Sequence, residues 1–165
     1  MIVREAMMGR LTATVLALAL FTATCRCAAD DKDPVYKGKS LSAWIEQLTD
    51  RSATARQDAA EALGKMGAPA KPAIGPLIAA LGDSDEVVRD AAATALSAFG
   101  KDAVGPLTNS LKHKEAAVRR GAADALGGIG PTARAAIPAL RDALPDKDED
   151  VRKAVADALK RIEMQ

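Results

Sequence analysis

Apolar residues recur along the chain in two helical patterns that alternate from residue 41 onward. In segments such as 74–81 the apolar side chains fall at i, i+3, i+4 and i+7, and in segments such as 88–99 at i, i+4, i+7, i+8 and i+11. Both spacings place one apolar stripe along a helix that is otherwise polar. The pattern therefore predicts a succession of paired amphipathic α-helices.

The pair of segments recurs four times, over residues 41–67, 74–100, 104–130 and 137–163 (repeats 1 to 4). The second segments align without gaps as ARQDAAEALGKMG, VRDAAATALSAFG, VRRGAADALGGIG and VRKAVADALKRIE. One helix pair cannot bury its own apolar stripe, so the four pairs must stack on one another. The sequence predicts an all-α fold, an α-solenoid in which Leu96 is a core residue.

Residues at the ends of the predicted helices suit their positions. Ser52, Asp85 and Asp148 stand where the second helix of a pair needs an N-cap. Glycines 67, 100 and 130 stand where a left-handed residue ends that helix. Prolines 76, 106 and 138 are expected in or near the first turn of the leading helices, where proline is tolerated.

The repeat resembles the HEAT repeat, in its short bacterial form that also occurs in phycobilin lyases. The resemblance rests on a leading helix that carries proline and ends in leucine, a short acidic turn, and the pattern V-R-x-x-A-A-x-A-L-x-x-[IFM]-G. It covers residues 41–163. It implies a protein-interaction scaffold without a catalytic step; the alternative is a lyase-like enzyme or enzyme subunit.

Composition narrows the chemistry that the chain can perform. Aromatic residues make up 2% of the chain, and there are one His and two Cys, so no catalytic residues, metal site or cofactor are predicted. HEAT-like relatives that bind iron need several histidines. A net charge of +1 argues against binding to nucleic acid. The expected partner is a protein or peptide.

The N-terminal stretch has the order of a secretory signal peptide. Residues 1–10 carry two arginines, residues 11–23 carry no charge, and Cys27-Ala28-Ala29 precedes a predicted cleavage site. The prediction is a signal peptide over 1–29, a polar linker over 30–40, a repeat domain over 41–165, and an exported, periplasmic or secreted protein. The alternative is a lipoprotein acylated at Cys25 and held at the membrane.

The second helices present four columns of residues that vary between repeats. These columns fall on one helix face, opposite the apolar stripe, and second helices line the concave surface of HEAT-like solenoids. Their mixed charges suit a protein or peptide partner. The candidate binding residues are Gln57, Glu61, Asp90, Thr94, Ser97, Arg120, Asp124, Lys153, Asp157 and Lys160. A merely solvated polar face is the alternative reading.

One arginine recurs unchanged in every repeat, beside the turn that joins the two helices. A structural ladder is expected, in which these arginines bind carboxylates or carbonyls of the turns. Turn acids are present at Asp50, Asp83 and Asp146, whereas His113 takes this position in repeat 3 and is expected to be only a turn residue. The ladder residues are Arg56, Arg89, Arg119 and Arg152.

Two further expectations concern packing. Trp44 occupies the column of Leu77 and is predicted to lie in the core. Gly121, Gly127 and Gly128 fall inside the second helix of repeat 3, where each costs about 1 kcal/mol relative to alanine. Repeat 3 is therefore predicted to be the least stable repeat.

Overall fold

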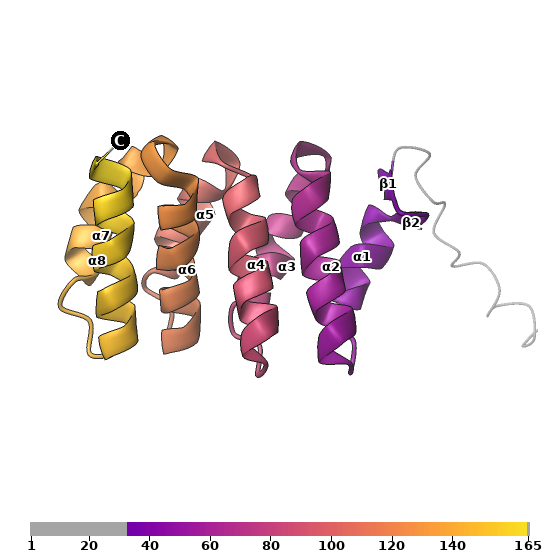
Figure 1. The fold of residues 1–165 in the computed structure, drawn as a ribbon, viewed down its shortest axis with the longest axis horizontal. Coiled ribbons are helices and arrows are strands. Elements are labelled where there is room, and N and C mark those ends of the chain that lie inside the picture. Colours follow the sequence, from indigo (N-terminus) through magenta and orange to yellow (C-terminus); the bar gives the residue numbers. More distant parts are fainter. Residues whose placement is uncertain (1–32, 165) are drawn as a thin grey trace, which may run out of the picture. The chain divides into compact units, whose positions relative to one another are not determined.

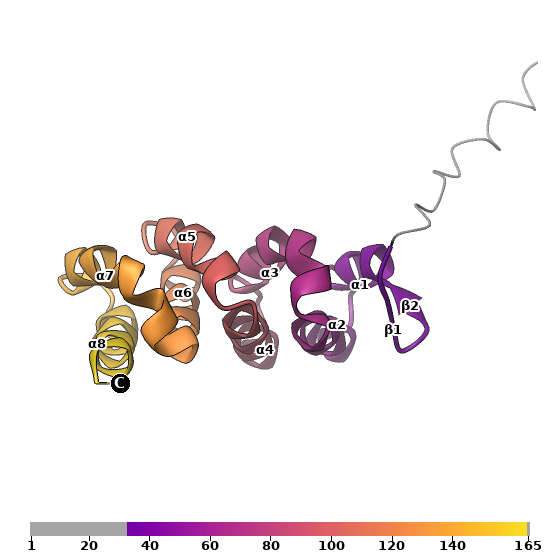
Figure 2. The same ribbon diagram turned by 90° about the horizontal axis from the view of Figure 1, so that it is seen from above.

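The repeat region is built from two layers of α-helices in a computed structural model that describes residues 33–164 (Figures 1 and 2). The predicted signal peptide and Cys25 lie outside the described residues. The first layer contains α1 (Leu41–Gln47), α3 (Ile74–Ala80), α5 (Lys101–Ser110) and α7 (Ile137–Ala143). The second contains α2 (Ala53–Met66), α4 (Glu86–Ala98), α6 (Ala116–Ile129) and α8 (Glu149–Glu163). The predicted α-solenoid is confirmed.

The second layer is the more tightly packed of the two. Helices α2, α4, α6 and α8 contact one another in sequence, whereas the first-layer helices contact one another much less (Figure 2). Alanines at two positions of every second-layer helix, and glycine at a third position in α2 and α6, let these helices approach closely.

The predicted caps of the second-layer helices are present. Ser52, Asp85 and Asp148 accept hydrogen bonds from backbone N–H groups in the first turns of α2, α4 and α8. Glycines 67, 100 and 130 follow the helices with φ of 62°, 55° and 68°. In repeat 3 the capping position is occupied by Glu115, whose side chain makes no capping bond.

The linkers between pairs differ in length, which changes how each leading helix begins. Short 3-10 helices η1 (Ala68–Ala73) and η2 (Gly130–Ala136) precede α3 and α7. The linker before repeat 3 is three residues shorter, and α5 starts directly after Gly100. Pro106 therefore lies inside α5, and the expectation that it sits near the first turn is wrong; Pro76 and Pro138 do lie there.

A single hydrophobic core runs between the two layers. Leu63, Leu96 and Leu126, one from each of the first three second-layer helices, are completely buried. Trp44 is 6% exposed, as predicted for a core residue. Such burial stabilises each leucine by roughly 1.5–3 kcal/mol relative to an exposed position.

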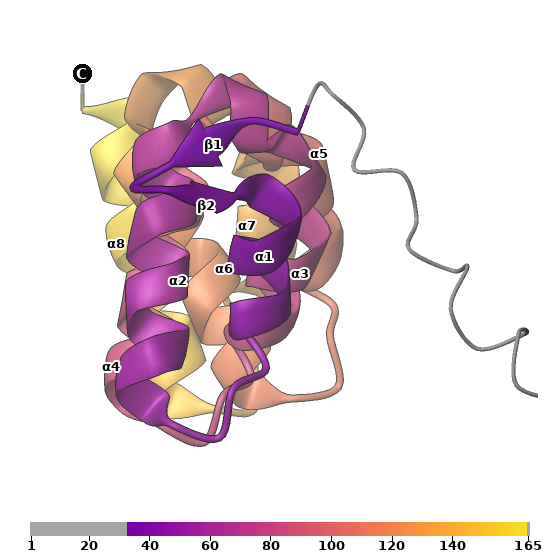
Figure 3. The ribbon, with the colours of Figure 1, turned by 90° about the vertical axis from the view of Figure 1, so that its right-hand side faces the viewer.

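A short β-hairpin precedes the first helix, within the stretch predicted as a polar linker. Strand β1 (Val35–Tyr36) pairs antiparallel with β2 (Lys39–Ser40), and β2 contacts α1 (Figure 3). The indole N–H of Trp44 donates to the Tyr36 carbonyl at 3.0 Å, and the Lys39 ammonium lies 4.6 Å from the centre of the Trp44 ring. The hairpin therefore covers the first-repeat end of the core.

Glycines within α6 have a packing role that the sequence analysis missed. A Cβ at Gly121 would lie 2.8 Å from Leu81, and one at Gly127 would lie 3.0 Å from the Cα of Ala158 on α8. The first separation would force the Leu81 side chain to move and the second is tighter than most Cβ contacts, so glycine at these positions favours close helix approach. The conformational cost of glycine is offset here by the packing it permits.

Among the described residues, none of the helices is long and apolar enough to span a membrane.

Candidate binding surface

The predicted binding residues lie on the second layer, and none of them is fully buried. Each comes from α2, α4, α6 or α8, because the apolar stripe of these helices turns the opposite face outward. Asp90, Asp124 and Asp157 form an acidic row over three successive helices. Basic residues stand beside this row, so the surface is mixed in charge.

Neighbouring side chains on this surface pair with one another. Gln57 donates to Glu61 at 3.0 Å, and Lys153 lies 2.7 Å from Glu149. Arg120 lies 3.6 Å from Asp124 and 3.8 Å from Glu86, which joins α6 to α4. Exposed pairs of this kind contribute little to stability, so a ligand can replace them at little cost.

Asp124 is the acid in the centre of the row. Partial burial raises its pKa above the ordinary range, the Arg120 guanidinium opposes that change, and the Asp90 and Asp157 carboxylates add to it. Its charge is therefore held at some cost in free energy. A cationic group brought to this row would relieve that cost.

A groove of about 500 Å³ runs between α2 and α4. Its apolar lining includes Val87, Ala91 and Ala98, and Val87 is 53% exposed. Its polar lining includes five side chains: Gln57, Glu61, Lys65, Asp90 and Thr94. A groove with both apolar and polar lining can take an apolar side chain of a partner and fix its orientation through hydrogen bonds.

Sequence reasoning found four of these polar residues but not the apolar residues that line the groove. The signal for Val87 lies in its column, where the other repeats carry Thr54, Ala117 and Asp150. Val87 directly precedes the core residue Val88, so the two valines together resemble a buried apolar start of the helix. Only the groove shows that Val87 is exposed while Val88 is completely buried.

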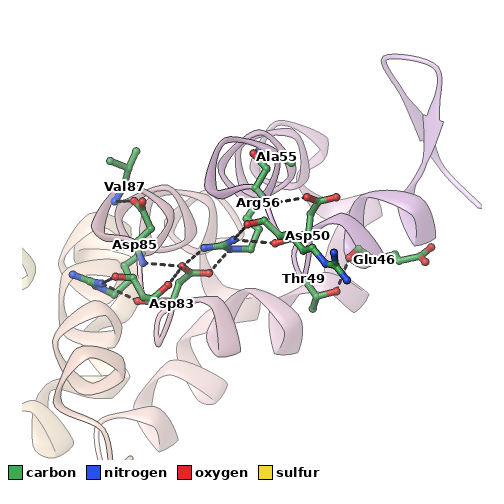
Figure 4. Close-up of polar contacts among 12 residues, drawn as sticks. Glu46, Thr49, Asp50, Ala55, Arg56, Asp83, Asp85 and Val87 are labelled. Atoms are coloured by element: carbon green, nitrogen blue, oxygen red, sulfur yellow. Dashed lines mark hydrogen bonds and ion pairs between the residues drawn. The ribbon is translucent and has the colours of Figure 1, made fainter.

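Two of the ladder arginines bind an aspartate of the following repeat. Nε and Nη2 of Arg56 donate to the two carboxylate oxygens of Asp83 at 2.6 and 2.7 Å (Figure 4). Arg119 holds Asp146 in the same way, at 2.7 and 2.8 Å. The paired arginines lower the pKa of both aspartates. Bidentate bonds of this kind fix orientation as well as adding energy.

All four ladder arginines also bind the turn of their own repeat. Nη1 donates to two consecutive backbone carbonyls, which for Arg56 are those of Asp50 and Arg51 (Figure 4). Arg89 and Arg152 make these carbonyl bonds and no ion pair among the described residues. The turn residue His113 accepts a hydrogen bond from the backbone N–H of Glu115 through Nδ1.

Comparison with known proteins gives the family. The profile of HEAT repeats matches residues 41–110 and 104–165. Among curated proteins, no sequence matches the chain.

Solved structures share the fold. The structure of human deoxyhypusine hydroxylase in complex with glycerol is 25% identical with a TM-score of 0.61, and the match covers 81% of this chain and 46% of that one. The complex of CpcE and CpcF of phycocyanin lyase from Nostoc is 23% identical over 80% of this chain and 69% of that one, with a TM-score of 0.44. A designed armadillo repeat protein in complex with a (KR)4 peptide is 21% identical over 74% and 64%, with a TM-score of 0.45.

The chain thus spans less than half the length of deoxyhypusine hydroxylase. The family match extends over nearly all of the region that forms the two helical layers. The chain belongs to the HEAT repeat family.

Proposed function

We propose that the repeat domain is a non-catalytic scaffold that binds a segment of a partner protein on its second layer. The observation that carries this proposal is the groove between α2 and α4, which the exposed side chain of Val87 lines. Apolar linings with a few polar groups are typical of binding sites. The expected ligand segment carries one apolar anchor side chain flanked by polar or charged residues.

The charges around the groove favour a segment with both kinds of polar contact. Glu61 and Asp90 offer carboxylates, while Lys65 offers an ammonium 3.9 Å from Glu61. Farther along the layer the row of Asp90, Asp124 and Asp157 favours a basic residue. Electrostatic complementarity of this kind sets specificity more than affinity.

Selection of peptides from a displayed random library against the full chain tests the proposal. Ala98→Arg would fill the groove, and Ala79→Arg is its control, because Ala79 is an exposed alanine of α3 in the other layer. Selected peptides should bind the Ala98→Arg variant at least about tenfold more weakly and the Ala79→Arg variant unchanged. Equal binding to both variants would place the site elsewhere, and failure to select any peptide would argue against a scaffold.

The competing proposal, a lyase-like enzyme or enzyme subunit, makes a different prediction. A protein of that kind purified from its natural source should carry or transfer a pigment that absorbs visible light. Detection of such a bound pigment, with no associated protein, would replace the scaffold by this alternative.

We also propose that the chain is exported and cleaved before Asp30. The charged start and the uncharged run over residues 11–23 support this. Mass spectrometry of the protein from producing cells should find Asp30 as the first residue. A lipid on Cys25 would instead support membrane anchoring, and an intact Met1 would contradict export.

A further inference from the structure

The ladder arginines have two hydrogen-bonding edges, and only one of them is satisfied at every repeat. The Nη1 group of each arginine is fixed by two carbonyls of its own turn, at 2.8 and 3.2 Å for Arg89. These bonds hold the guanidinium in the same orientation in each repeat. The second edge, formed by Nε and Nη2, faces the turn of the next repeat, where Arg56 and Arg119 each hold an aspartate.

At the junction between repeats 2 and 3 this second edge has no acceptor among the described residues. The position occupied by Asp83 and Asp146 at the other junctions is His113 in repeat 3. Its Nδ1 already accepts from the backbone N–H of Glu115 at 3.2 Å, which leaves Nε2 carrying the proton. A histidine in this state has no further acceptor atom to offer, so it cannot replace the missing carboxylate.

The nearest acid on that turn is also engaged elsewhere. Glu115 pairs with Lys114 at 3.8 Å, and a Cβ placed at Gly82 would lie 2.9 Å from its other carboxylate oxygen. Glu115 thus reaches across the junction to the backbone at Gly82 and forms no ion pair with Arg89. Nε and Nη2 of Arg89 therefore have no acceptor among the described residues, although the carbonyl bonds of Nη1 hold the guanidinium in place.

The turn of repeat 3 is more basic than the corresponding turns of repeats 2 and 4. It reads Lys112-His113-Lys114, whereas the corresponding turns contain Asp83-Ser84 and Asp146-Lys147. Lys112 and Lys114 are exposed. Arg89 itself lines a pocket with Arg120 and four acids, Asp90, Asp124, Asp148 and Asp150, so the proposal rests on the geometry of its fork and not on a basic surrounding.

We propose that the junction between repeats 2 and 3 is a carboxylate-binding site, in which Nε and Nη2 of Arg89 donate to the two oxygens of a ligand's carboxylate. The planar two-oxygen anion is chosen because the identical fork holds such a group twice in this chain, at 2.6–2.8 Å. The ligand is the acidic side chain or C-terminus of a bound protein, or a small free carboxylate. The site is separate from the groove between α2 and α4 and does not depend on the scaffold proposal.

Arg152 provides an internal control. It makes the same two carbonyl bonds and forms no ion pair among the described residues. Any carboxylate that pairs with exposed guanidinium groups in general will affect Arg89 and Arg152 alike. A built site affects Arg89 alone.

The test is a titration of the isotope-labelled full chain, monitored through the arginine Nε–H resonances. The probes are acetate, the peptide acetyl-Ala-Asp-Ala-amide and its Asn analogue. The Arg89 signal should shift and saturate with the carboxylates but not with the Asn peptide, while the Arg152 signal moves at least about tenfold less at equal concentration. Equal saturation by acetate identifies a small carboxylate as the ligand, and tighter binding of the Asp peptide identifies a protein.

Two variants complete the test. Arg89→Lys retains the charge but removes the fork, and His113→Asp should supply an internal carboxylate that occupies it. Arg89→Lys removes the Arg89 resonance and so assigns it, His113→Asp should abolish its saturable shift, and His113→Asn should preserve that shift. Absence of saturation in the unmodified chain, or equal responses of Arg89 and Arg152, would overturn the proposal.

Discussion

The junction between repeats 1 and 2 and the junction between repeats 2 and 3 use the same positions of the repeat but not the same contacts. At the first, Arg56 binds Asp83 through two hydrogen bonds, and Gly64 lets α2 lie against Ala95 of α4. At the second, Arg89 has no carboxylate, and the α4–α6 interface is smaller than those of α2–α4 and α6–α8. The junction between repeats 3 and 4 matches the first.

The array therefore consists of two similar halves, each a pair of repeats joined by an Arg–Asp bridge. The two matches to the HEAT profile, over residues 41–110 and 104–165, divide the chain at nearly the same place. Short linkers and a shared core still join the halves, because Leu96 of α4 and Leu126 of α6 are both completely buried. The central junction is therefore continuous in its apolar contacts and different in its polar ones.

A truncation in the core should reduce stability the most, and it tests whether the core is continuous between the two halves. Leu96→Ala removes a completely buried side chain from α4, which belongs to both junctions. It should lower the free energy of unfolding by about 2–5 kcal/mol through lost burial and a cavity. Denaturant unfolding followed by circular dichroism should retain one transition. Two separated transitions would mean that the halves unfold independently.

The next prediction compares the stability lost when the arginine is replaced at a junction with an Arg–Asp bridge and at the junction without one. Arg119→Gln removes the ion-pair partner of Asp146, whose side chain is 12% exposed and retains only the backbone N–H of Asp148, and should cost about 2–3 kcal/mol, between the values for surface and buried pairs. Arg89→Gln removes only carbonyl bonds and should cost about 1 kcal/mol or less. Thermal denaturation of the two variants measures the contrast. Equal losses would show that the Arg–Asp bridge adds nothing beyond the carbonyl bonds.

The bridges also predict a pH dependence. Arg56 and Arg119 lower the pKa of Asp83 and Asp146 below the unfolded value of about 3.9. Their stabilisation is then complete above that unfolded value and is lost as the pH falls through the lower pKa of the folded state. Unfolding free energies measured from pH 7 down to about pH 2 should fall less steeply in the double variant Asp83→Asn, Asp146→Asn. An identical slope in this variant would exclude the bridges as the source.

The smallest effect is expected from a substitution that gives the junction between repeats 2 and 3 an Arg–Asp bridge. His113→Asp should provide Arg89 with the carboxylate that the other junctions have, and stabilise the chain by about 1 kcal/mol. His113→Asn is the control, because it has the same size without the charge. Melting temperatures that rise for both variants alike would point to an effect of removing histidine and not to a new bridge.

Much of the fold could be predicted from the sequence because the same pattern recurs in four repeats, so each repeat supports the alignment of the others. The register of Leu63, Leu96 and Leu126 follows from periodicity, and the caps at Ser52 and Asp85 follow from local chemistry. Contacts between repeats are harder to predict. The sequence showed that His113 replaces an acid, but not that this leaves one edge of Arg89 open.

Other features could not be predicted because they depend on how helices approach in space. Gly121 and Gly127 look like weak points in a helix until the structure places Leu81 and Ala158 against them. We now expect the lowest amide protection at the surface between α4 and α6 and not throughout repeat 3. For the candidate groove, polar residues were found from their variability, while Val87 was hidden because an apolar residue at a helix start looks like core.

The hairpin that covers the first repeat has an optical consequence. Trp44 is the only tryptophan of the chain, and its surroundings are the Tyr36 carbonyl, the Lys39 ammonium and the core. Detachment of residues 35–40 would expose the indole to water and free its N–H while the distant repeats remain folded. The intrinsic fluorescence of this protein is therefore a local reporter of one end of the array, and comparison with far-ultraviolet circular dichroism distinguishes fraying of that end from global unfolding.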